Sequence, residues 1–191
     1  MALKQKVCKS CRNKFVPSRP MQSACSTACA IAIAERKRQK QAQQEEARKR
    51  KEARQRLESM KGIPELIREA DKAFCAFIRA RDAGKPCICC GRSSSGWSRG
   101  GDWDAGHYRS RGAASHLRYH EDNCHSQLKQ CNRRAFDVAS YRANLIGRIG
   151  LEEVEALEQD NRTHKWTRDE LREIRDTYRR KLREMLKARR P

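Results

Sequence analysis

The sequence predicts a mainly helical α+β protein built from small modules that metal ions hold together. Of its 191 residues, 37% are hydrophobic and 36% are charged, which leaves little apolar surface for one large core. The chain has ten cysteines, several of them in close pairs, as is typical of zinc sites. Long segments consist of strong helix formers. We therefore expect a helical protein whose small β elements are stabilised by zinc.

The balance of charge predicts a polyanionic partner. Lysine and arginine total 44 against 24 acidic residues, which gives a net charge of +20. Nucleic acid is the first candidate for such a basic chain, and a solvated basic surface without a partner is the alternative. No apolar run is long enough for a secretory signal or a membrane span, so we expect a cytoplasmic protein without membrane contact. In that reducing compartment, paired thiols favour zinc over disulfides.

The chain is expected to fold in three parts. They are a cysteine module, a charged helical connector and a main domain, at residues 1–30, 31–61 and 62–191. In the first part, the pairs Cys8/Cys11 and Cys25/Cys29 provide four thiols with the spacing of one tetrahedral zinc site. The spacing predicts a treble-clef-like zinc finger whose second pair lies at the start of a helix, with Ser26 and Thr27 where an N-cap is expected.

The connector consists almost entirely of Ala, Gln, Glu, Lys and Arg, which predicts one long helix from Ile31 to Lys61. Large apolar residues are scarce and follow no heptad stripe, so we expect a solvated helix and not a coiled coil. Two interpretations stay open for this basic helix. It either lies along a DNA backbone or serves as a charged spacer.

The main domain is expected to begin with an amphipathic helix. Between Ile63 and Arg81, apolar residues recur with helical spacing, and Pro64 suits the first turn. Cys75 lies off the apolar stripe and has no thiol nearby in the sequence. We therefore expect this cysteine to have no metal role.

Three further helices are expected near the C-terminus. Two cover residues 135–149 and 151–158, and a capping box of Thr167 and Glu170 begins the last one. This last helix carries an apolar face from Leu171 to Met185 and ends in a basic tail. The apolar face is expected to pack either on the 63–81 helix or on a second subunit, which leaves a homodimer as an open alternative.

Between these helices, a short segment predicts a β-hairpin followed by a helix. Asp102–His107 is expected to form the first strand and Leu117–Tyr119 the second, with Asn123 in the following loop. A helix is expected to start near Asn132. A histidine on the first strand and a metal ligand at the helix start make this a ββα-metal arrangement, flanked by zinc knuckles and basic helices.

The residue types in this segment suit the hydrolysis of a phosphodiester. That reaction needs a base, a divalent cation and cationic groups that hold the substrate. His107 suits the base because the pKa of a histidine is already near 7. Carboxylate and amide oxygens hold a hard cation while leaving positions for phosphate and water. Five arginines nearby predict phosphate contacts, with ordinary surface charge as the alternative: Arg109, Arg111, Arg118, Arg133 and Arg134.

The chain resembles a known family. The specific part of the resemblance reads DAGHYRSRG…HLRYHEDNCHSQ…CNRRAFD. It is similar to the zinc-containing HNH, or His-Me finger, nucleases, and over nearly its full length the chain resembles the NinG (Rap) recombination endonucleases of lambda-like phages. The resemblance implies a structure-specific endonuclease that cuts branched DNA, including D-loops and Holliday junctions, with magnesium or manganese. It also implies the cytoplasm of an infected bacterial host.

The resemblance also implies roles for individual residues. His107 matches the general base, and Asn132 matches the residue that binds the catalytic metal at the helix start. Cys87 and Cys90 match the first pair of thiols of a second zinc site. Cys131 matches the last thiol of that site.

The sequence departs from the family pattern at two positions. Many relatives carry Asp directly before the base, where this chain has Gly106, so Asp104 is the expected substitute as catalytic-metal ligand. Leu128 stands where a thiol of the second zinc site is expected. The fourth zinc ligand must then come from elsewhere, and the candidates are Cys124, His125 and Cys89.

A function of a different class remains open. A non-catalytic zinc-containing regulator that binds DNA through its finger and basic helices would share the charge and the thiol pairs. It would need no hydrolytic metal. Metal-dependent cleavage of DNA therefore separates the two interpretations.

Overall fold

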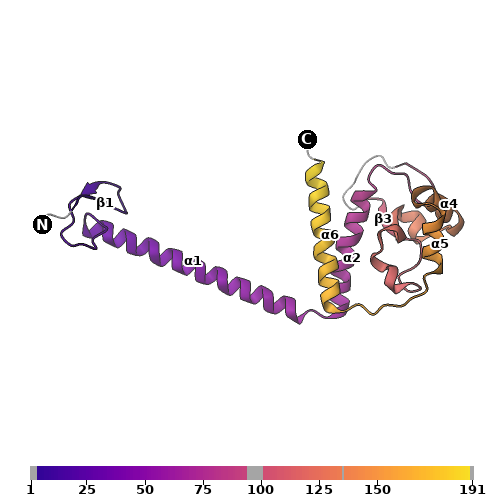
Figure 1. The fold of residues 1–191 in the computed structure, drawn as a ribbon, viewed down its shortest axis with the longest axis horizontal. Helices are drawn as coiled ribbons and strands as arrows, with labels where there is room; N and C mark the ends of the chain where they lie inside the picture. The colour runs from indigo at the N-terminus through magenta and orange to yellow at the C-terminus, as the bar shows by residue number, and fades with distance from the viewer. Residues whose placement is uncertain (1–3, 94–100, 135, 190–191) are drawn as a thin grey trace. The chain divides into compact units, whose positions relative to one another are not determined.

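The computed structural model describes residues 4–93, 101–134 and 136–189. The chain divides into two compact units, residues 1–60 and 61–191. Figure 1 shows the elements of both units. Among the described residues, no helix combines the length and the apolar character needed to cross a membrane.

The first unit consists of a small hairpin and one long helix. Strand β1 (Lys6–Val7) pairs antiparallel with β2 (Lys14–Phe15). Helix α1 (Thr27–Met60) follows, and the Ser26 hydroxyl accepts a hydrogen bond of 3.3 Å from the amide of Cys29, as expected for an N-cap. No residue of α1 is buried, so the expectation of a solvated helix is confirmed.

In the second unit, the first and last helices pack side by side (Figure 1). They are α2 (Ile63–Arg81) and α6 (Arg168–Ala188). Thr167 and Glu170 form the expected capping box at the start of α6. The ring of Tyr178 lies 4.8 Å from the ring of Phe74, centroid to centroid. The apolar face of α6 is thus covered inside the chain, which was the first of the two alternatives.

A two-stranded antiparallel sheet packs against α2. Strand β3 (Trp103–His107) confirms the first predicted strand. The second predicted strand was wrong, because Leu117–Tyr119 belongs to the 3₁₀ helix η1 (Ser115–Tyr119). Its place in the sheet is taken by β4 (Cys124–Leu128), which follows a second 3₁₀ helix, η2 (Glu121–Asn123). Four of the five β4 residues are buried, so its side chains show no polar and apolar alternation.

Three shorter helices complete the second unit. Helix α3 (Lys129–Arg133) follows β4 directly, slightly earlier than the expected start at Asn132. Helix α4 (Val138–Ile149) begins at the N-cap Asp137, whose carboxylate accepts from two backbone amides. The predicted start of this helix, residue 135, lies outside the described residues. Helix α5 (Leu151–Gln159) follows immediately.

The sheet is flanked by two separate apolar cores. The first joins α2, α6 and one side of the sheet, and its largest members are Leu66, Phe74, Phe77, Ile78, Tyr119, Leu171 and Tyr178. The second joins α4, α5 and the loops, and its members include Ile88, Leu117, Tyr141, Leu145, Val154 and Leu157. Small cores on both sides agree with the low apolar content of the sequence.

Candidate functional site

Two short loops in the chain share one backbone geometry and each presents a pair of thiols. In the first loop, the amide of Arg12 donates to the carbonyl of Cys8 over 3.0 Å. In the second, the amide of Gly91 donates to the carbonyl of Cys87 over 2.9 Å. Both Arg12 (φ 67°) and Gly91 (φ 69°) have a left-handed backbone conformation. This conformation costs glycine little conformational energy and other residues about 1–2 kcal/mol. Both loops have the form of a zinc knuckle.

The first cluster contains the four thiols that the sequence predicted. The sulfurs of Cys8, Cys11, Cys25 and Cys29 all lie within 4.8 Å of one another. Backbone hydrogen bonds, led by that of Cys11, lower the pKa of the Cys8 thiol to about 6, and side-chain hydrogen bonds, led by that of Cys11, raise the pKa of the Cys25 thiol to about 12. Because four sulfurs lie this close together, the cluster could hold a tetrahedral zinc ion.

The second cluster contains three thiols. The sulfurs of Cys87, Cys90 and Cys131 lie within 4.8 Å of one another, as the resemblance implied. Neither Cys124 nor His125 belongs to this group, so the prediction that one of them supplies the fourth zinc ligand was wrong. The physical reason is the strand β4, which starts at Cys124 and directs both side chains to other partners.

Cys124 is buried in the first apolar core instead. Its side chain is fully inaccessible, and its sulfur lies 3.7 Å from Nδ1 of His107, its partner across the sheet. Burial raises the pKa of the Cys124 thiol well above its ordinary value, so the group stays protonated. A neutral thiol in an apolar core packs as a small hydrophobic side chain.

His125 is held in a buried polar network. Its Nδ1 lies 2.9 Å from a guanidinium nitrogen of Arg81, and its Nε2 lies 3.1 Å from the carbonyl of Asp122. An arginine only donates and a carbonyl only accepts, so the proton resides on Nε2 and the ring is neutral. Burial lowers the pKa of His125, in agreement with this assignment. His125 therefore fixes the hairpin to α2, and both of its ring nitrogens are engaged by other groups.

The centre of this network is Asp82, which the sequence gave no reason to single out. Asp82 is 1% exposed, forms a two-point ion pair with Arg81 over 2.9 Å and accepts a hydrogen bond from the Ser126 amide. Burial raises the pKa of this carboxyl group, but the hydrogen bonds and the positive charge of Arg81 more than offset it. The pKa therefore lies far below its ordinary value.

The candidate active site is a cavity of about 440 Å³ beside the sheet. It brings together the three residues that the sequence assigned to catalysis, His107, Asp104 and Asn132. The complete lining is Cys75, Arg79, Asp104, Ala105, His107, Ser110, Arg111, Asn132 and Arg133. Residues from α2, β3, the following loop and α3 thus meet at one place, although Cys75 and Arg133 lie 58 positions apart in the sequence.

The geometry of His107 defines its protonation. Its Nε2 lies 2.9 Å from the carbonyl of Arg118, and a carbonyl can only accept a hydrogen bond. The proton of the neutral ring is therefore on Nε2, and Nδ1 carries the free electron pair. Burial lowers the pKa of His107, so the neutral form predominates at pH 7. A neutral imidazole with its lone pair on Nδ1 can accept a proton, and the buried Cys124 thiol lies 3.7 Å from that atom.

Asp104 and Asn132 contact each other across the hairpin and α3. The amide nitrogen of Asn132 donates to a carboxylate oxygen of Asp104 over 3.2 Å, and the Nε of Arg133 donates to the same oxygen over 3.2 Å. The two side chains therefore lie in contact, and they offer an amide oxygen and a carboxylate oxygen. Both are hard oxygen donors of the kind that Mg²⁺ and Mn²⁺ prefer.

The predicted phosphate contacts need correction at two of the five arginines. The guanidinium of Arg109 donates to the carbonyls of Leu157, Glu158 and Asp160, where it caps the end of α5. Arg118 forms a two-point ion pair with Asp71 over 2.8 and 2.5 Å. The guanidinium groups of Arg109 and Arg118 are therefore engaged by carbonyl and carboxylate groups of the protein itself. Arg111, Arg133 and Arg134 remain exposed, and the first two line the cavity.

The loop after β3 is held by Asn123. Asn123 is fully buried, and its amide group donates to the carbonyls of Arg109 and Leu117 and accepts from the amide of Arg109. These hydrogen bonds fasten both ends of the loop that begins at His107. They thereby fix the loop that carries Arg111.

The sequence interpretation missed a polar stripe on α2. Asp71, Cys75 and Arg79 follow one another at intervals of four, which places them on one face of a helix. Asp71 pairs with Arg111 and Arg118, while Cys75 and Arg79 line the cavity. The four-residue spacing could be read from the sequence, but only the packing of α2 against β3 shows that Cys75 and Arg79 line a cavity.

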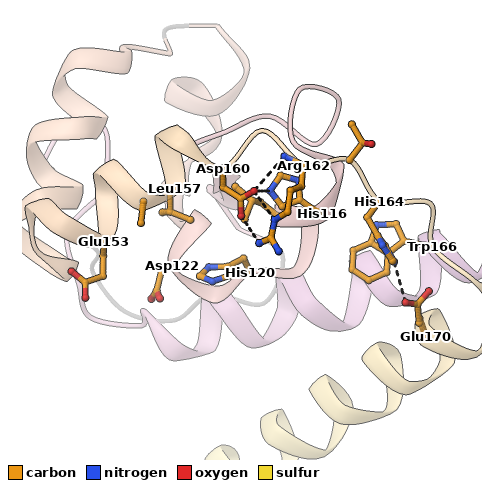
Figure 2. A pocket seen from close by; sticks show the side chains of 13 residues that line it. His116, His120, Asp122, Glu153, Leu157, Asp160, Arg162, His164, Trp166 and Glu170 are labelled. Atoms are coloured by element: carbon orange, nitrogen blue, oxygen red, sulfur yellow. Dashed lines mark hydrogen bonds and ion pairs between the residues drawn. The ribbon is translucent and has the colours of Figure 1, made fainter.

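A larger cavity, of about 620 Å³, lies elsewhere in the second unit (Figure 2). Asp160 pairs with Arg162 over 2.6 Å, and Glu170 pairs with His164 over 3.0 Å. The walls of this larger cavity carry four carboxylates, at Asp122, Glu153, Asp160 and Glu170. An acidic wall repels phosphate. For a polyanionic substrate we therefore favour the smaller cavity.

Replacing Gly106 with alanine is expected to lower the free energy of unfolding by about 1–3 kcal/mol. A Cβ at position 106 would lie 1.8 Å from the side-chain oxygen of Gln127 and 3.2 Å from its Cβ. Gln127 is fully buried, so its side chain would have to shift within the packed interior to relieve the overlap. The Cβ of an aspartate at position 106 would meet the same atoms of Gln127. Urea unfolding followed by tryptophan fluorescence measures the change.

Gly112→Ala is the matched control for this experiment. A Cβ at position 112 would meet no heavy atom within 4 Å, so its stability should stay near that of the wild type. If the two variants unfolded at the same urea concentration, the close approach of Gln127 to Gly106 would not constrain the hairpin.

Comparisons with known proteins give the chain a family. A family model described as the bacteriophage lambda NinG protein matches residues 1–188. A protein ninG of Escherichia phage 933W is 42% identical over 124 residues, and proteins ninG of Salmonella phage P22 and Escherichia phage lambda are each 41% identical over 124 residues. These matches cover 64% of this chain and 58–59% of each relative, so the chain spans under two thirds of their length. No solved structure matches.

Proposed function

The chain belongs to the NinG family of phage proteins, and from this premise we propose that it is a metal-dependent DNA endonuclease of the HNH type. Its substrates are branched recombination intermediates such as D-loops and Holliday junctions. The observation that carries the proposal is the cavity that joins His107, Asp104 and Asn132. Zinc at the two cysteine clusters has a structural role, since it fastens loops that have little apolar core of their own.

His107 acts as the general base in this proposal. Its Nδ1 takes a proton from water, the resulting hydroxide attacks the phosphorus, and the bond to the leaving oxygen breaks. The hydrogen bond from Nε2 to the Arg118 carbonyl keeps the ring in the required tautomer. This carbonyl also stabilises the positive charge that the ring gains when it accepts the proton.

Asp104 and Asn132 would hold the catalytic Mg²⁺ or Mn²⁺ through a carboxylate oxygen and an amide oxygen. When bound, such an ion neutralises charge on the scissile phosphate and the leaving oxygen. Two protein donors fit this use, because Mg²⁺ commonly keeps several waters and takes substrate phosphate as a further ligand. Their position in one cavity supports the pairing, and the amide nitrogen of Asn132 donates to Asp104 over 3.2 Å.

Arginines around the cavity would hold the DNA backbone in line. Arg79 comes from α2, Arg111 from the loop after β3 and Arg133 from α3, so they approach from three elements. The side chains of Arg111 and Arg133 are 50% and 66% exposed, which leaves them accessible to phosphate. The net charge of +20 supports attraction of DNA over longer distances.

Purified full-length protein is expected to nick branched DNA only when a divalent cation is present. The test uses linear, forked and four-way DNA of matched sequence, with Mg²⁺, Mn²⁺ or EDTA. We expect cleavage of the forked and four-way substrates that EDTA abolishes and added Mg²⁺ restores.

Two other outcomes would correct the proposal in different ways. Binding to all three substrates without nicking would favour the non-catalytic regulator. Equal cleavage of all three would retain the nuclease but remove its preference for branched DNA.

A further inference from the structure

We propose that the second metal centre is a three-thiolate site whose fourth coordination position takes an exchangeable small donor, such as water or an imidazole. Cys87, Cys90 and Cys131 supply three sulfurs within 4.8 Å of one another, while a structural zinc ion takes four ligands. The inference concerns the chain's own donors and does not depend on the proposed endonuclease activity.

No other side chain of the described residues completes the set. Among the described residues, no further sulfur, imidazole nitrogen or carboxylate oxygen lies within 4.8 Å of all three thiols. The residues outside the described ranges contain no Cys, His, Asp or Glu. The fourth donor must therefore come from a rearranged side chain or from outside the protein.

Cys89 is the one candidate for such a rearrangement. It is 3% exposed and packs in the same small cluster as Cys87 and Cys131. Its sulfur, however, is directed to the carbonyl of Asp137, 3.9 Å away. Its own carbonyl accepts a hydrogen bond of 3.2 Å from the Asn144 side chain, which holds the loop in place. Turning this thiol toward the other three would break its contact with the Asp137 carbonyl.

Leu128 lies beside this centre, together with Trp103. It packs against the cluster of Cys87, Cys89 and Cys131, and its backbone amide donates to the sulfur of Cys87 over 3.3 Å. A leucine cannot donate electrons to a metal ion. Since Cys90 is exposed, a small donor from solvent can reach a metal bound at this centre.

This geometry makes Leu128→Cys the decisive variant. A thiol at position 128 would start from a backbone that already contacts Cys87 and would give the centre a fourth sulfur. Loss of an outer-shell partner alone commonly costs about 10–100-fold in metal affinity, so a direct thiolate should tighten binding by at least ~10-fold. The site would then also lose its exchangeable position.

Cobalt(II) is a suitable probe, because its sulfur charge-transfer absorption grows with each thiolate that binds it. The full-length wild type, Leu128→Cys and Cys89→Ser are loaded with Co²⁺, and circular dichroism checks that each variant is folded. We expect one additional thiolate per chain in Leu128→Cys and no change in Cys89→Ser. In a separate competition with a chelator, zinc-loaded Leu128→Cys should keep the zinc ion of its second centre at least ~10-fold longer than the wild type does.

Added imidazole tests the wild type without any substitution in the cluster. The spectrum of the Co²⁺-loaded wild type should shift on addition of imidazole, and that of Leu128→Cys should not. Loss of one thiolate in Cys89→Ser would assign the fourth position to Cys89 and overturn the inference. An imidazole-insensitive wild type would overturn it as well, even if Leu128→Cys failed to fold.

Discussion

Replacing His107 with alanine is expected to slow the cleavage of branched DNA by about 10²–10⁴-fold, the usual contribution of a positioned general base. DNA binding should remain, because the arginines around the cavity are unchanged. Single-turnover cleavage of a four-way junction measures the rate, and fluorescence anisotropy of the same labelled junction measures binding. A His107→Ala variant that cut at the wild-type rate would rule out the mechanism.

His120→Ala is the matched control for His107→Ala. His120 is exposed and lines the larger, acidic cavity, so its loss should leave the cleavage rate unchanged. The pH profile gives a second readout. Burial lowers the pKa of His107, so the wild-type rate should hold through pH 7 and fall only below the ordinary histidine pKa of about 6.5. The residual activity of His107→Ala should lack this fall.

Replacing Asp82 with alanine is expected to destabilise the second unit by about 3–5 kcal/mol, as is typical when one partner of a buried ion pair is removed. The variant would leave the guanidinium groups of Arg81 and Arg148 without their shared carboxylate, at side-chain exposures of 19% and 15%. The Ser126 amide would lose its acceptor as well. All tryptophans of the chain lie in this unit, so urea unfolding followed by tryptophan fluorescence measures its stability.

The pH dependence of stability distinguishes this charge effect from lost packing. The folded pKa of Asp82 is depressed, so its contribution is present above the unfolded value of about 3.9 and is lost as the pH falls toward the folded value. Asp82→Ala should therefore lack part of the acid sensitivity of the wild type. Asp169→Ala, with a side chain that is 94% exposed, is the control and should unfold like the wild type. Equal stability of all three proteins at pH 7 would show that the Asp82 network contributes little.

The elements that could be predicted from the sequence are those specified by neighbouring residues. The periodicity between Ile63 and Arg81 gave α2 with its observed bounds, and the capping box at Thr167 gave the start of α6. Strand β4 was missed because its polar residues are buried by segments that are distant in sequence, so no local alternation marks it. A strand of this kind is recognised only by what covers it.

The same distinction applies to the candidate site. The sequence singled out His107, Asp104 and Asn132, and the structure brings them into one cavity. It also predicted phosphate contacts by Arg109 and Arg118, and these side chains instead bind the end of α5 and Asp71. An arginine carries the same charge in either role. The positions of its neighbours decide which role it has.

The sequence by itself determined the composition of this protein's sites: two pairs of thiols for one cluster, three thiols for another, and a histidine between basic residues. These follow from residue types and short spacings, which the chain carries wherever it folds. Only the tertiary structure decided that Cys124 and His125 turn away from the second cluster and that Asp82 holds a buried charge network. Those outcomes depend on burial and on contacts between residues about 40 positions apart, because side-chain orientation is fixed by packing and not by sequence neighbours.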